Sequence, residues 1–233
     1  MGSPQSRELE QWLREHVDRA DLEEAIQALS AGFVYKIASL ERRLAGKEPD
    51  PKTRLINFPR FIEQLEKFLA IEQRSRWCAI GLAGIATLEP RRDTDGHAAS
   101  DRIVARAARL LQQQVRSDDL VSRTPQRAFC FLIPRLSGQE KAFAVGERLR
   151  DAVEQYDWTL EGRQRQEPLA RLDVGIVSLR LGRAAERRFI ARRLAADLIK
   201  RAGELMDRAS KEPASRTRLA RMRIRKGEAV PIS

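Results

Sequence analysis

A histidine among three carboxylates is the first group of residues in this chain whose types suggest chemistry. Asp93, Asp95 and Asp101 flank His97 within one short stretch. Imidazole and carboxylate groups are common ligands of divalent metals, so a metal site is one interpretation. The alternative is structural, because His97 and Asp93 can serve as turn or capping residues where a helix begins. We expect the structural role.

Basic residues are concentrated near the end of the chain. Residues 216–226 contain six Arg and Lys residues and no acid. Such a strip is typical of a disordered solubilising tail, or of a contact with nucleic acid, acidic lipid or acidic protein. The strip has no interleaved aromatic residues, so its sequence does not support base stacking. We expect a basic C-terminal tail over 213–233, with nucleic-acid binding as an alternative.

The composition indicates a protein with a core and an excess of positive charge. The 233 residues are 42% hydrophobic and 33% charged, and the formal net charge is +11. This suits one domain with additions and excludes a wholly disordered chain. Cys78 and Cys130 lie in apolar runs, which indicates reduced core thiols and excludes a disulfide framework. The longest apolar run, 77–88, is much shorter than the ~20 residues of a membrane span, and the chain does not begin with a signal-peptide pattern. We therefore expect no membrane span and a cytoplasmic location.

The elements that must position these residues begin with a helix. Apolar residues between 26 and 44 recur every three or four positions, which is the period of an amphipathic helix. Asp21 can cap its start, and Gly46 with the Pro-containing stretch 48–51 ends it. We expect a helical segment over 1–48 that either packs on its own domain or serves in dimerisation or signal input.

Helix and strand patterns alternate after residue 56. The patterns predict helices at 58–69, 97–115, 142–153 and 186–209, and strands at 77–88, 158–160 and 169–179, with a hairpin within 120–134. Asn57 is placed to cap the first of these helices. The order predicts an α/β sandwich in which helices cover a sheet.

Four segments together resemble the GGDEF domain of bacterial diguanylate cyclases. Residues 50–61 are similar to its opening D-x-L-T-G-L-x-N-R-R-x-F motif. Residues 93–101 resemble the N-D-x-x-G-H-x-x-G-D entry to a helix, with Arg92 at the Asn position. Residues 116–123 are similar to R-x-x-D-L-V-x-R, and residues 172–177 to V-S-I-G-V-A. The match runs from about residue 50 to residue 212.

This resemblance implies both a fold and a reaction. The fold is α/β (α+β) and palm-like, as in nucleotide cyclases: a five-stranded, mostly antiparallel sheet flanked by helices, here with an N-terminal helical extension. The reaction joins two GTP molecules into cyclic di-GMP between two domains that meet face to face. The expected divisions are a helical segment over 1–48, a GGDEF domain over 49–212 and the basic tail over 213–233.

The residues at the family's metal-binding positions do not suit that reaction. Mg²⁺ prefers carboxylate oxygens, and the family supplies one acid from the first core strand and one from the signature hairpin. Those two positions hold Gly84 and Arg127 here, and neighbouring acids are replaced by Ala86 and Ala128. A cationic side chain thus stands where a divalent cation is expected.

Other active-site positions depart from the family as well. The signature becomes Pro125-Gln126-Arg127-Ala128-Phe129, so the two turn glycines are replaced by residues without their backbone freedom. Arg92 replaces the Asn that contacts guanine, and Ser210 and Ala214 replace the basic pair that grips phosphate. Asp101, the family's second guanine contact, persists. We expect a degenerate domain without cyclase activity, and no Mg²⁺ or other cofactor.

The resemblance also implies a ligand site that has survived. The family's inhibitory site binds cyclic di-GMP through an R-x-x-D sequence five residues before the signature, and Arg116 and Asp119 keep that spacing. A second arginine usually joins from the following helix, which points to Arg148. Alternatively, Arg116 and Asp119 simply connect the end of a helix to a strand.

Two functions are therefore expected. The first is an inactive GGDEF domain that acts as a cyclic di-GMP receptor through Arg116, Asp119 and Arg148. The alternative is a ligand-independent scaffold that forms a homodimer or holds a protein partner in bacterial signalling.

Overall fold

The computed structural model describes most of the chain after residue 47. The described residues are 48–72, 76–86, 96–125, 128–161, 170–182, 187, 189–212, 216–225 and 228–232, with the backbone alone at 96–100 and 161. The chain divides into two compact units, Met1–Gly46 and Lys47–Ser233. Apart from Glu48, the expected helical segment 1–48 lies outside the described residues.

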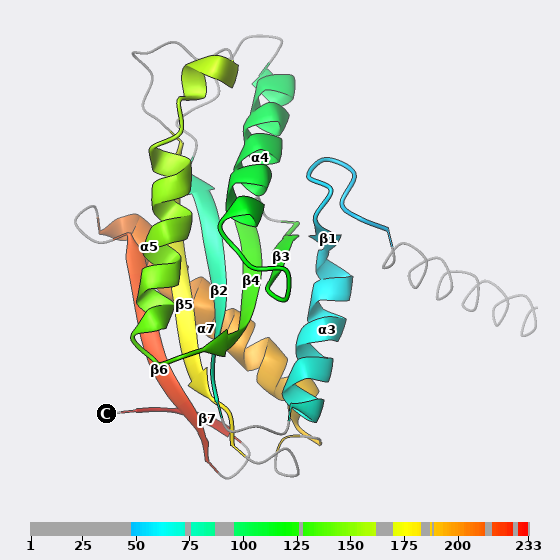
Figure 1. Cartoon of the computed structure of the whole chain (residues 1–233), viewed down its shortest axis with the longest axis vertical. Helices are drawn as coiled ribbons and strands as arrows, with labels where there is room; N and C mark the ends of the chain where they lie inside the picture. Colours follow the sequence, from blue (N-terminus) through cyan, green and yellow to red (C-terminus); the bar gives the residue numbers. More distant parts are fainter. Residues whose placement is uncertain are drawn as a thin grey trace, which may run out of the picture. The chain divides into compact units, whose positions relative to one another are not determined.

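One mixed sheet forms the centre of the second unit (Figure 1). Its strands are β1 (Ile56–Asn57), β2 (Trp77–Ala86), β3 (Leu120–Arg123), β4 (Ala128–Leu136), β5 (Arg171–Arg180), β6 (Thr217–Arg225) and β7 (Glu228–Pro231). Their order across the sheet is β1-β3-β4-β2-β5-β6-β7. The β1–β3 and β5–β6 pairs are parallel, and the other neighbours are antiparallel. The expected helix-flanked, mostly antiparallel sheet is confirmed, but it has seven strands instead of five.

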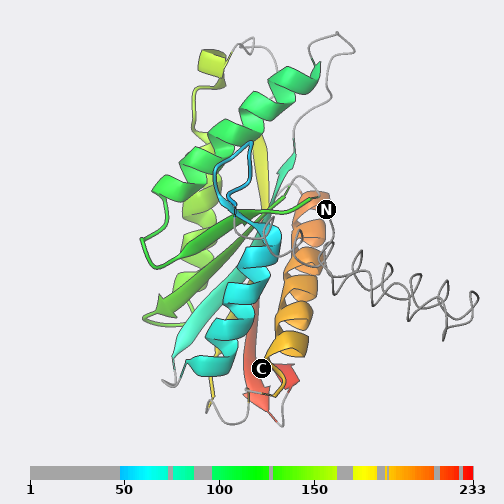
Figure 2. The same cartoon turned by 90° about the vertical axis from the view of Figure 1, so that its right-hand side faces the viewer.

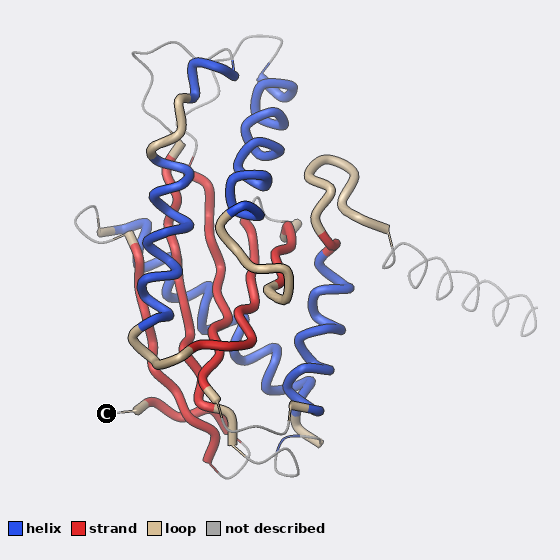
Figure 3. The backbone as a smooth tube through the Cα atoms, viewed as in Figure 1, coloured by secondary structure: helices blue, strands red, loops and turns tan. Residues whose placement is uncertain are grey.

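Helices cover both faces of this sheet. They are α3 (Phe58–Ile71), α4 (Gly96–Gln113), α5 (Lys141–Glu154) and α7 (Ala191–Lys211). The pair α4 and α5 packs on one face, and the pair α3 and α7 packs on the other, as Figures 2 and 3 show. None of the described helices combines the length and the apolar composition that a membrane crossing requires.

Alternation along the strands divides the core into two layers. In β4, Phe129 and Phe131 point into the cluster under α4 and α5, whereas Cys130 and Leu132 point into the cluster under α3 and α7. Both faces are buried because successive strand residues point in opposite directions and each face has its own helix pair. This explains why the central strands lack the alternation of apolar and polar residues that marks a half-exposed strand.

The first described helix follows the sequence expectation closely. Asn57 caps α3, since its side-chain oxygen accepts a hydrogen bond from the backbone N–H of Arg60 at 3.0 Å. Phe61, Leu65 and Leu69 recur every four residues and are buried against the sheet. The cap and the apolar stripe thus fix where α3 begins and which side it buries.

Helix α7 and strand β5 approach each other at a glycine. A Cβ atom on Gly175 would lie 2.1 Å from the carbonyl oxygen of Ala202 and 2.3 Å from the backbone nitrogen of Met206. Both neighbours are backbone atoms of α7, so only glycine permits this packing distance. The glycine of the 172–177 motif therefore sets the position of the last helix on the sheet.

The expected C-terminal tail differs from the structure. Residues 217–225 and 228–231 form β6 and β7, which extend the sheet beyond β5. From Arg221 to Arg225 the sequence alternates Arg with Met222 and Ile224, which is the period of a strand with one buried face. The concentration of charge hid this alternation in the sequence analysis.

A smaller expectation was wrong at residues 158–160. This segment is a 3₁₀ helix, Trp158–Glu161, and not a strand. Asp157 caps it by accepting hydrogen bonds from the backbone and hydroxyl of Thr159. Trp158 is buried and donates its indole N–H to the carbonyl of Val153 at 2.9 Å. The cap and this hydrogen bond back to the end of α5 outweigh the strand preference of the aromatic residue.

Candidate functional site

Of the two positions that correspond to the family's metal-binding acids, Gly84 lies on β2 and Arg127 lies outside the described residues. Gly84 near the end of β2 pairs with Ala128, the first residue of β4. On its other side Gly84 pairs with Asp173 of β5. The structure thus places Gly84 beside the start of the hairpin strand β4, and neither Gly84 nor Ala128 offers an oxygen ligand from its side chain.

A methionine occupies the space in front of Gly84. A Cβ atom added to Gly84 would meet the sulfur of Met206 at 3.1 Å, closer than an ordinary van der Waals contact. Met206 belongs to α7, and its unbranched thioether suits an irregular gap of this kind. An acidic side chain at residue 84 would therefore need Met206 to move.

The carboxylate of Asp173, the residue that pairs in register with Gly84 on β5, already has a cationic partner. Asp173 is 4% exposed, and its Oδ1 lies 3.3 Å from a guanidinium nitrogen of Arg216. Burial raises the pKa of Asp173 above its usual range, while the charges of Arg216 and Arg171 oppose that rise. Arg216 stands immediately before β6, so the strand that sequence analysis missed also supplies this partner.

These residues do not fit a divalent cation. A magnesium ion needs several oxygen ligands in a regular arrangement. Gly84 and Ala128 contribute none from their side chains, and Asp173 is paired with a guanidinium. Within the described part of the chain, no group of three or more His, Cys, Asp or Glu side chains is arranged to hold a metal ion.

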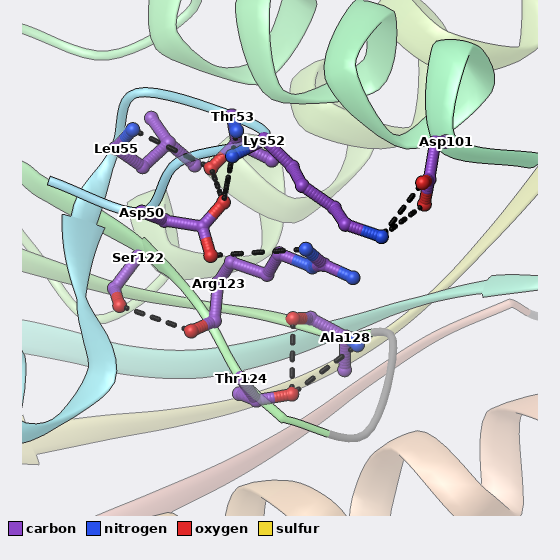
Figure 4. Close-up of polar contacts among 9 residues, drawn as sticks. All are labelled: Asp50, Lys52, Thr53, Leu55, Asp101, Ser122, Arg123, Thr124 and Ala128. Atoms are coloured by element: carbon purple, nitrogen blue, oxygen red, sulfur yellow. Dashed lines mark hydrogen bonds and ion pairs between the residues drawn. The ribbon is translucent and has the colours of Figure 1, made fainter. Parts of the chain in front are cut away.

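The signature hairpin closes through a threonine (Figure 4). The Thr124 backbone N–H donates to the carbonyl of Ala128 at 2.8 Å, and the Thr124 hydroxyl contacts both the carbonyl and the N–H of Ala128. Four residues connect the two strands: Thr124, then Pro125, which is exposed, and Gln126 and Arg127, which lie outside the described residues. Phe129, the last residue of the signature, is buried in the core under α4 and α5.

The opening motif folds into a loop around Asp50. One carboxylate oxygen of Asp50 accepts hydrogen bonds from the backbone of Lys52 and from the backbone and hydroxyl of Thr53 (Figure 4). The other oxygen lies 3.7 Å from the Arg123 guanidinium at the end of β3. Arg54 has φ +62°, a left-handed conformation at the place where the D-x-L-T-G-L motif has glycine. The loop geometry persists although the glycine has been lost.

Asp101, which stands at the position of the family's second guanine contact, is engaged inside the chain. Lys52 donates to both carboxylate oxygens of Asp101, at 2.8 and 2.6 Å (Figure 4). Lys52 stands where the opening motif has leucine, and this substitution is the signal that could have revealed the pair. Arg92 lies outside the described residues, and only the backbone is described at His97. The structure therefore does not test either role considered for His97.

The family's phosphate-gripping positions also lack a cation here. Ser210 is exposed near the end of α7, and its hydroxyl donates to the carbonyl of Asp207 at 2.9 Å. Ala214 lies outside the described residues. Ser210 thus bonds to its own helix.

Arg116 and Asp119 form a tight turn between α4 and β3. The backbone N–H of Asp119 donates to the carbonyl of Arg116 at 3.1 Å, and the Asp119 carboxylate accepts from the backbone N–H of Arg116 at 2.8 Å. The turn uses only backbone atoms of Arg116, so its side chain is not needed to hold the loop. The carboxylate of Asp119, in contrast, has a structural role in any case.

Two guanidinium groups influence the Asp119 carboxylate. Burial raises the pKa of Asp119 above its usual range, and the charges of Arg116 and Arg148 counteract this rise. Both arginines are exposed. The adjacent Asp118 bonds Arg135, at 2.8 Å from its Nε, and this bond lowers the pKa of Asp118. The structure thus brings the three expected ligand residues into one electrostatic neighbourhood.

Comparison with known families gives one match over most of the chain. The family model "Diguanylate cyclase, GGDEF domain" matches residues 48–216. No curated protein matches the chain.

Several solved structures share the fold. The coiled coil and GGDEF domain of DgcB from Caulobacter crescentus, in complex with c-di-GMP, is 18% identical, with a TM-score of 0.59 over 84% of this chain and 98% of that chain. The diguanylate cyclase SiaD from Pseudomonas aeruginosa, in complex with its activator SiaC, is 23% identical, with a TM-score of 0.56. The match covers 93% of this chain and 78% of that chain. The FimX GGDEF domain from the same organism is 22% identical, with a TM-score of 0.57. The match covers 74% of this chain and 98% of that chain.

Proposed function

The chain belongs to the GGDEF family, and from this premise we propose that it is a catalytically inactive member that serves as a receptor for cyclic di-GMP. The binding site is formed by Arg116, Asp119 and Arg148. The absence of cyclase activity follows from the residues at the strand ends.

Three substitutions support inactivity. Gly84 and Arg127 stand at the positions of the family's two metal-binding acids, and Ala128 replaces a neighbouring acid. Met206 fills the space that an acid at residue 84 would occupy. Without carboxylates to hold Mg²⁺ against a triphosphate, the 3′-hydroxyl of GTP is not activated.

A turnover assay tests inactivity. The full chain is incubated with GTP and Mg²⁺, and cyclic di-GMP is measured by chromatography beside an active diguanylate cyclase in the same buffer. We expect no product above the buffer blank. Accumulation of cyclic di-GMP that scales with protein concentration would overturn this part of the proposal.

The observation that carries the receptor function is the geometry of the Arg116–Asp119 turn. Backbone hydrogen bonds hold the turn, so the exposed Arg116 side chain can bind a ligand without loosening the loop. A guanidinium donates in a fork to the N7 and O6 edge of guanine or to phosphate. A carboxylate accepts from the N1–H and amino group of the same base. Arg148 adds a second exposed cation beside a dianionic dinucleotide.

Binding of labelled cyclic di-GMP to variants tests the receptor function. Arg116→Ala and Arg148→Ala should each weaken binding at least about tenfold, which is the effect of losing one charge-assisted contact. Arg192→Ala is the matched control, because Arg192 is an exposed arginine on α7 outside the site. Equal affinity in the Arg116→Ala, Arg148→Ala and control proteins would argue against this site.

Exposed apolar side chains favour a second candidate, the ligand-independent scaffold. Ile71 at the end of α3 is 58% exposed, and Phe189 just before α7 is 93% exposed. Arg187 donates to the carbonyls of Leu69 and Glu72, which holds these two segments at the same end of the domain. If the protein is a scaffold, we expect the native chain to self-associate in sedimentation velocity experiments. Phe189→Ser should weaken that self-association. A monomer in both proteins would leave this candidate without support.

A further inference from the structure

Strands β5 and β6 carry four arginines on one face of the sheet. Arg221, Arg223 and Arg225 alternate along β6 and therefore share a face. Arg180 of β5 pairs in register with Arg223, which adds it to the same face. All four side chains are exposed. This is the face of α4 and α5, since Leu219, two residues before Arg221, packs into the core below those helices.

Helix α5 covers only the other end of these strands. A Cβ atom on Gly146 would contact Ile176 and Thr217, so α5 crosses β5 and β6 near the start of β6. Figure 1 shows the ends of β5 and β6 continuing past the first turn of α5. The arginines thus lie on a part of the sheet that none of the described helices covers.

The four arginines lack ion-pair partners among the described residues, although Glu228 of β7 pairs in register with Arg225 and bonds Arg193. Nearby arginines have acidic partners: Arg216 pairs with Asp173, Arg218 with Glu212, and Arg193 with Glu228. In contrast, none of Arg180, Arg221, Arg223 and Arg225 forms an ion pair within the part of the chain that the structure describes. Uncompensated like charges this close repel one another, so an anionic partner would stabilise the arrangement.

An aromatic side chain lies next to the arginines. Trp77 of β2 pairs in register with Arg180, and Arg180 pairs with Arg223. A row across three strands therefore reads Trp77, Arg180, Arg223 on one face. Trp77 is half-buried, so part of its indole is accessible. The basic strip contains no aromatic residue of its own, and it is the fold that supplies one.

We propose that this arginine face, formed by Trp77, Arg180, Arg221, Arg223 and Arg225, binds single-stranded nucleic acid. Alternate residues of a strand are about 6.6 Å apart and neighbouring strands about 4.8 Å apart, so the guanidinium groups form a compact two-dimensional array for phosphates. The indole at the edge of the array offers a surface on which a base can stack. A half-buried indole suits stacking better than insertion into lipid. The arginines lie on the face of a seven-stranded sheet, which is wider than the helix or two-stranded ribbon that the major groove of a duplex admits.

Fluorescence anisotropy of the full chain with a labelled oligouridine of about 16 nucleotides tests this proposal. Three to four phosphate contacts predict that the logarithm of affinity falls with the logarithm of salt concentration with a slope of about −2 to −3. Arg223→Gln should weaken binding and reduce the magnitude of the slope by about 0.7. Arg192→Gln removes the same charge from α7 and should leave the slope unchanged. Circular dichroism of both variants checks that they are folded.

Two further measurements separate this surface from general electrostatic attraction. In a Trp12→Phe background, oligouridine should quench the remaining tryptophan fluorescence, and adding Trp77→Phe should remove most of that quenching, because Trp158 is buried. The second measurement is the binding of the full chain to vesicles rich in phosphatidylserine. Binding to vesicles without binding to oligouridine, or equal losses in Arg223→Gln and Arg192→Gln, would overturn the proposal.

Discussion

Arg54 shows how a family turn persists after its glycine has been replaced. Its φ of +62° is a left-handed conformation that costs a side-chain-bearing residue roughly 1–2 kcal/mol. The hydrogen bonds that Asp50 accepts from Lys52 and Thr53 hold the loop in place despite this cost. Arg54 is exposed, so its side chain contributes little packing.

We expect Arg54→Gly to stabilise the protein by about 0.5–1 kcal/mol, since glycine relieves the strain but has a more flexible unfolded state. Urea denaturation measures the difference. Arg54→Ala is the control, and it should give no gain because alanine keeps the unfavourable φ. A gain in the alanine variant equal to that of the glycine variant would contradict this explanation.

The ionised carboxylate of Asp119 is predicted to lower the stability of the folded protein while contributing to ligand binding. Its folded pKa is raised by burial, so its ionised form costs stability as pH rises through that pKa, and the cost is absent below the unfolded value of 3.8. Asp119→Asn keeps an oxygen that can accept from the Arg116 N–H. The variant should therefore be slightly more stable at neutral pH, equal in stability at pH values below 3.8, and defective in cyclic di-GMP binding. Urea midpoints across pH test this, and a variant less stable at neutral pH would contradict it.

The residue types predicted that the family's metal-binding acids are absent from the sequence, but not which side chains lie at those positions in the fold. The structure places Gly84 on β2 and Asp101 on α4. The partners of these positions, Met206 and Lys52, come from other segments and depend on side-chain packing. A leucine-to-lysine change in the opening motif was the only local signal for the second pair.

At the scale of elements, the contact between α7 and β5 depends on one glycine. In Gly175→Ala the new Cβ would overlap backbone atoms of Ala202 and Met206, and helix α7 cannot move away from these without losing its buried face. We expect a loss of about 3 kcal/mol or more in unfolding free energy.

Gly203 provides a matched control within the same helix–sheet contact. A Cβ there would lie 3.6 Å from Leu82, an ordinary contact, and the residue is in the middle of α7. Gly203→Ala should therefore gain about 0.5–1 kcal/mol from helix propensity. If both alanine variants lost stability equally, the close approach at Gly175 would not be the cause.

The elements that sequence analysis located well are those with a strong local pattern. Helix α3 has a cap and a regular apolar stripe, and the hairpin of β3 and β4 has two apolar runs around a turn. Strand β6 was missed because its exposed positions are all arginine, so composition suggested a tail while the two-residue period indicated a strand. The 3₁₀ helix at Trp158 depends on a bond to Val153 that periodicity does not reveal.

At the scale of the whole molecule, β6 and β7 are part of the folded unit. β6 pairs with β5 over seven positions, buries Thr217 and Met222, and brings Arg216 to Asp173. Removing residues 213–233 would expose the edge of β5 and uncover part of both core layers. We expect the truncated chain to lose cooperative unfolding or to aggregate, as measured by circular dichroism and urea titration. An unchanged urea midpoint would instead indicate a dispensable tail.

The positive charge of the chain is also distributed differently in space than along the sequence. Arginines of the supposed tail are divided between the two faces of the sheet: Arg218 pairs with Glu212, while Arg221 and Arg223 join Arg180 on the face of α4 and α5. The fold therefore changes a linear basic strip into a surface that also contains an aromatic residue. A linear sequence contains the charges of this surface but not its geometry.

The central claim, that this GGDEF domain has kept a cyclic di-GMP site while losing its chemistry, is tested most directly by calorimetric titration of the full chain with cyclic di-GMP. We predict saturable heat that is abolished by Arg116→Ala and unaffected by Mg²⁺, since the turn that presents Arg116 needs no metal. A titration without heat in the native protein, or the same heat in Arg116→Ala, would contradict the claim.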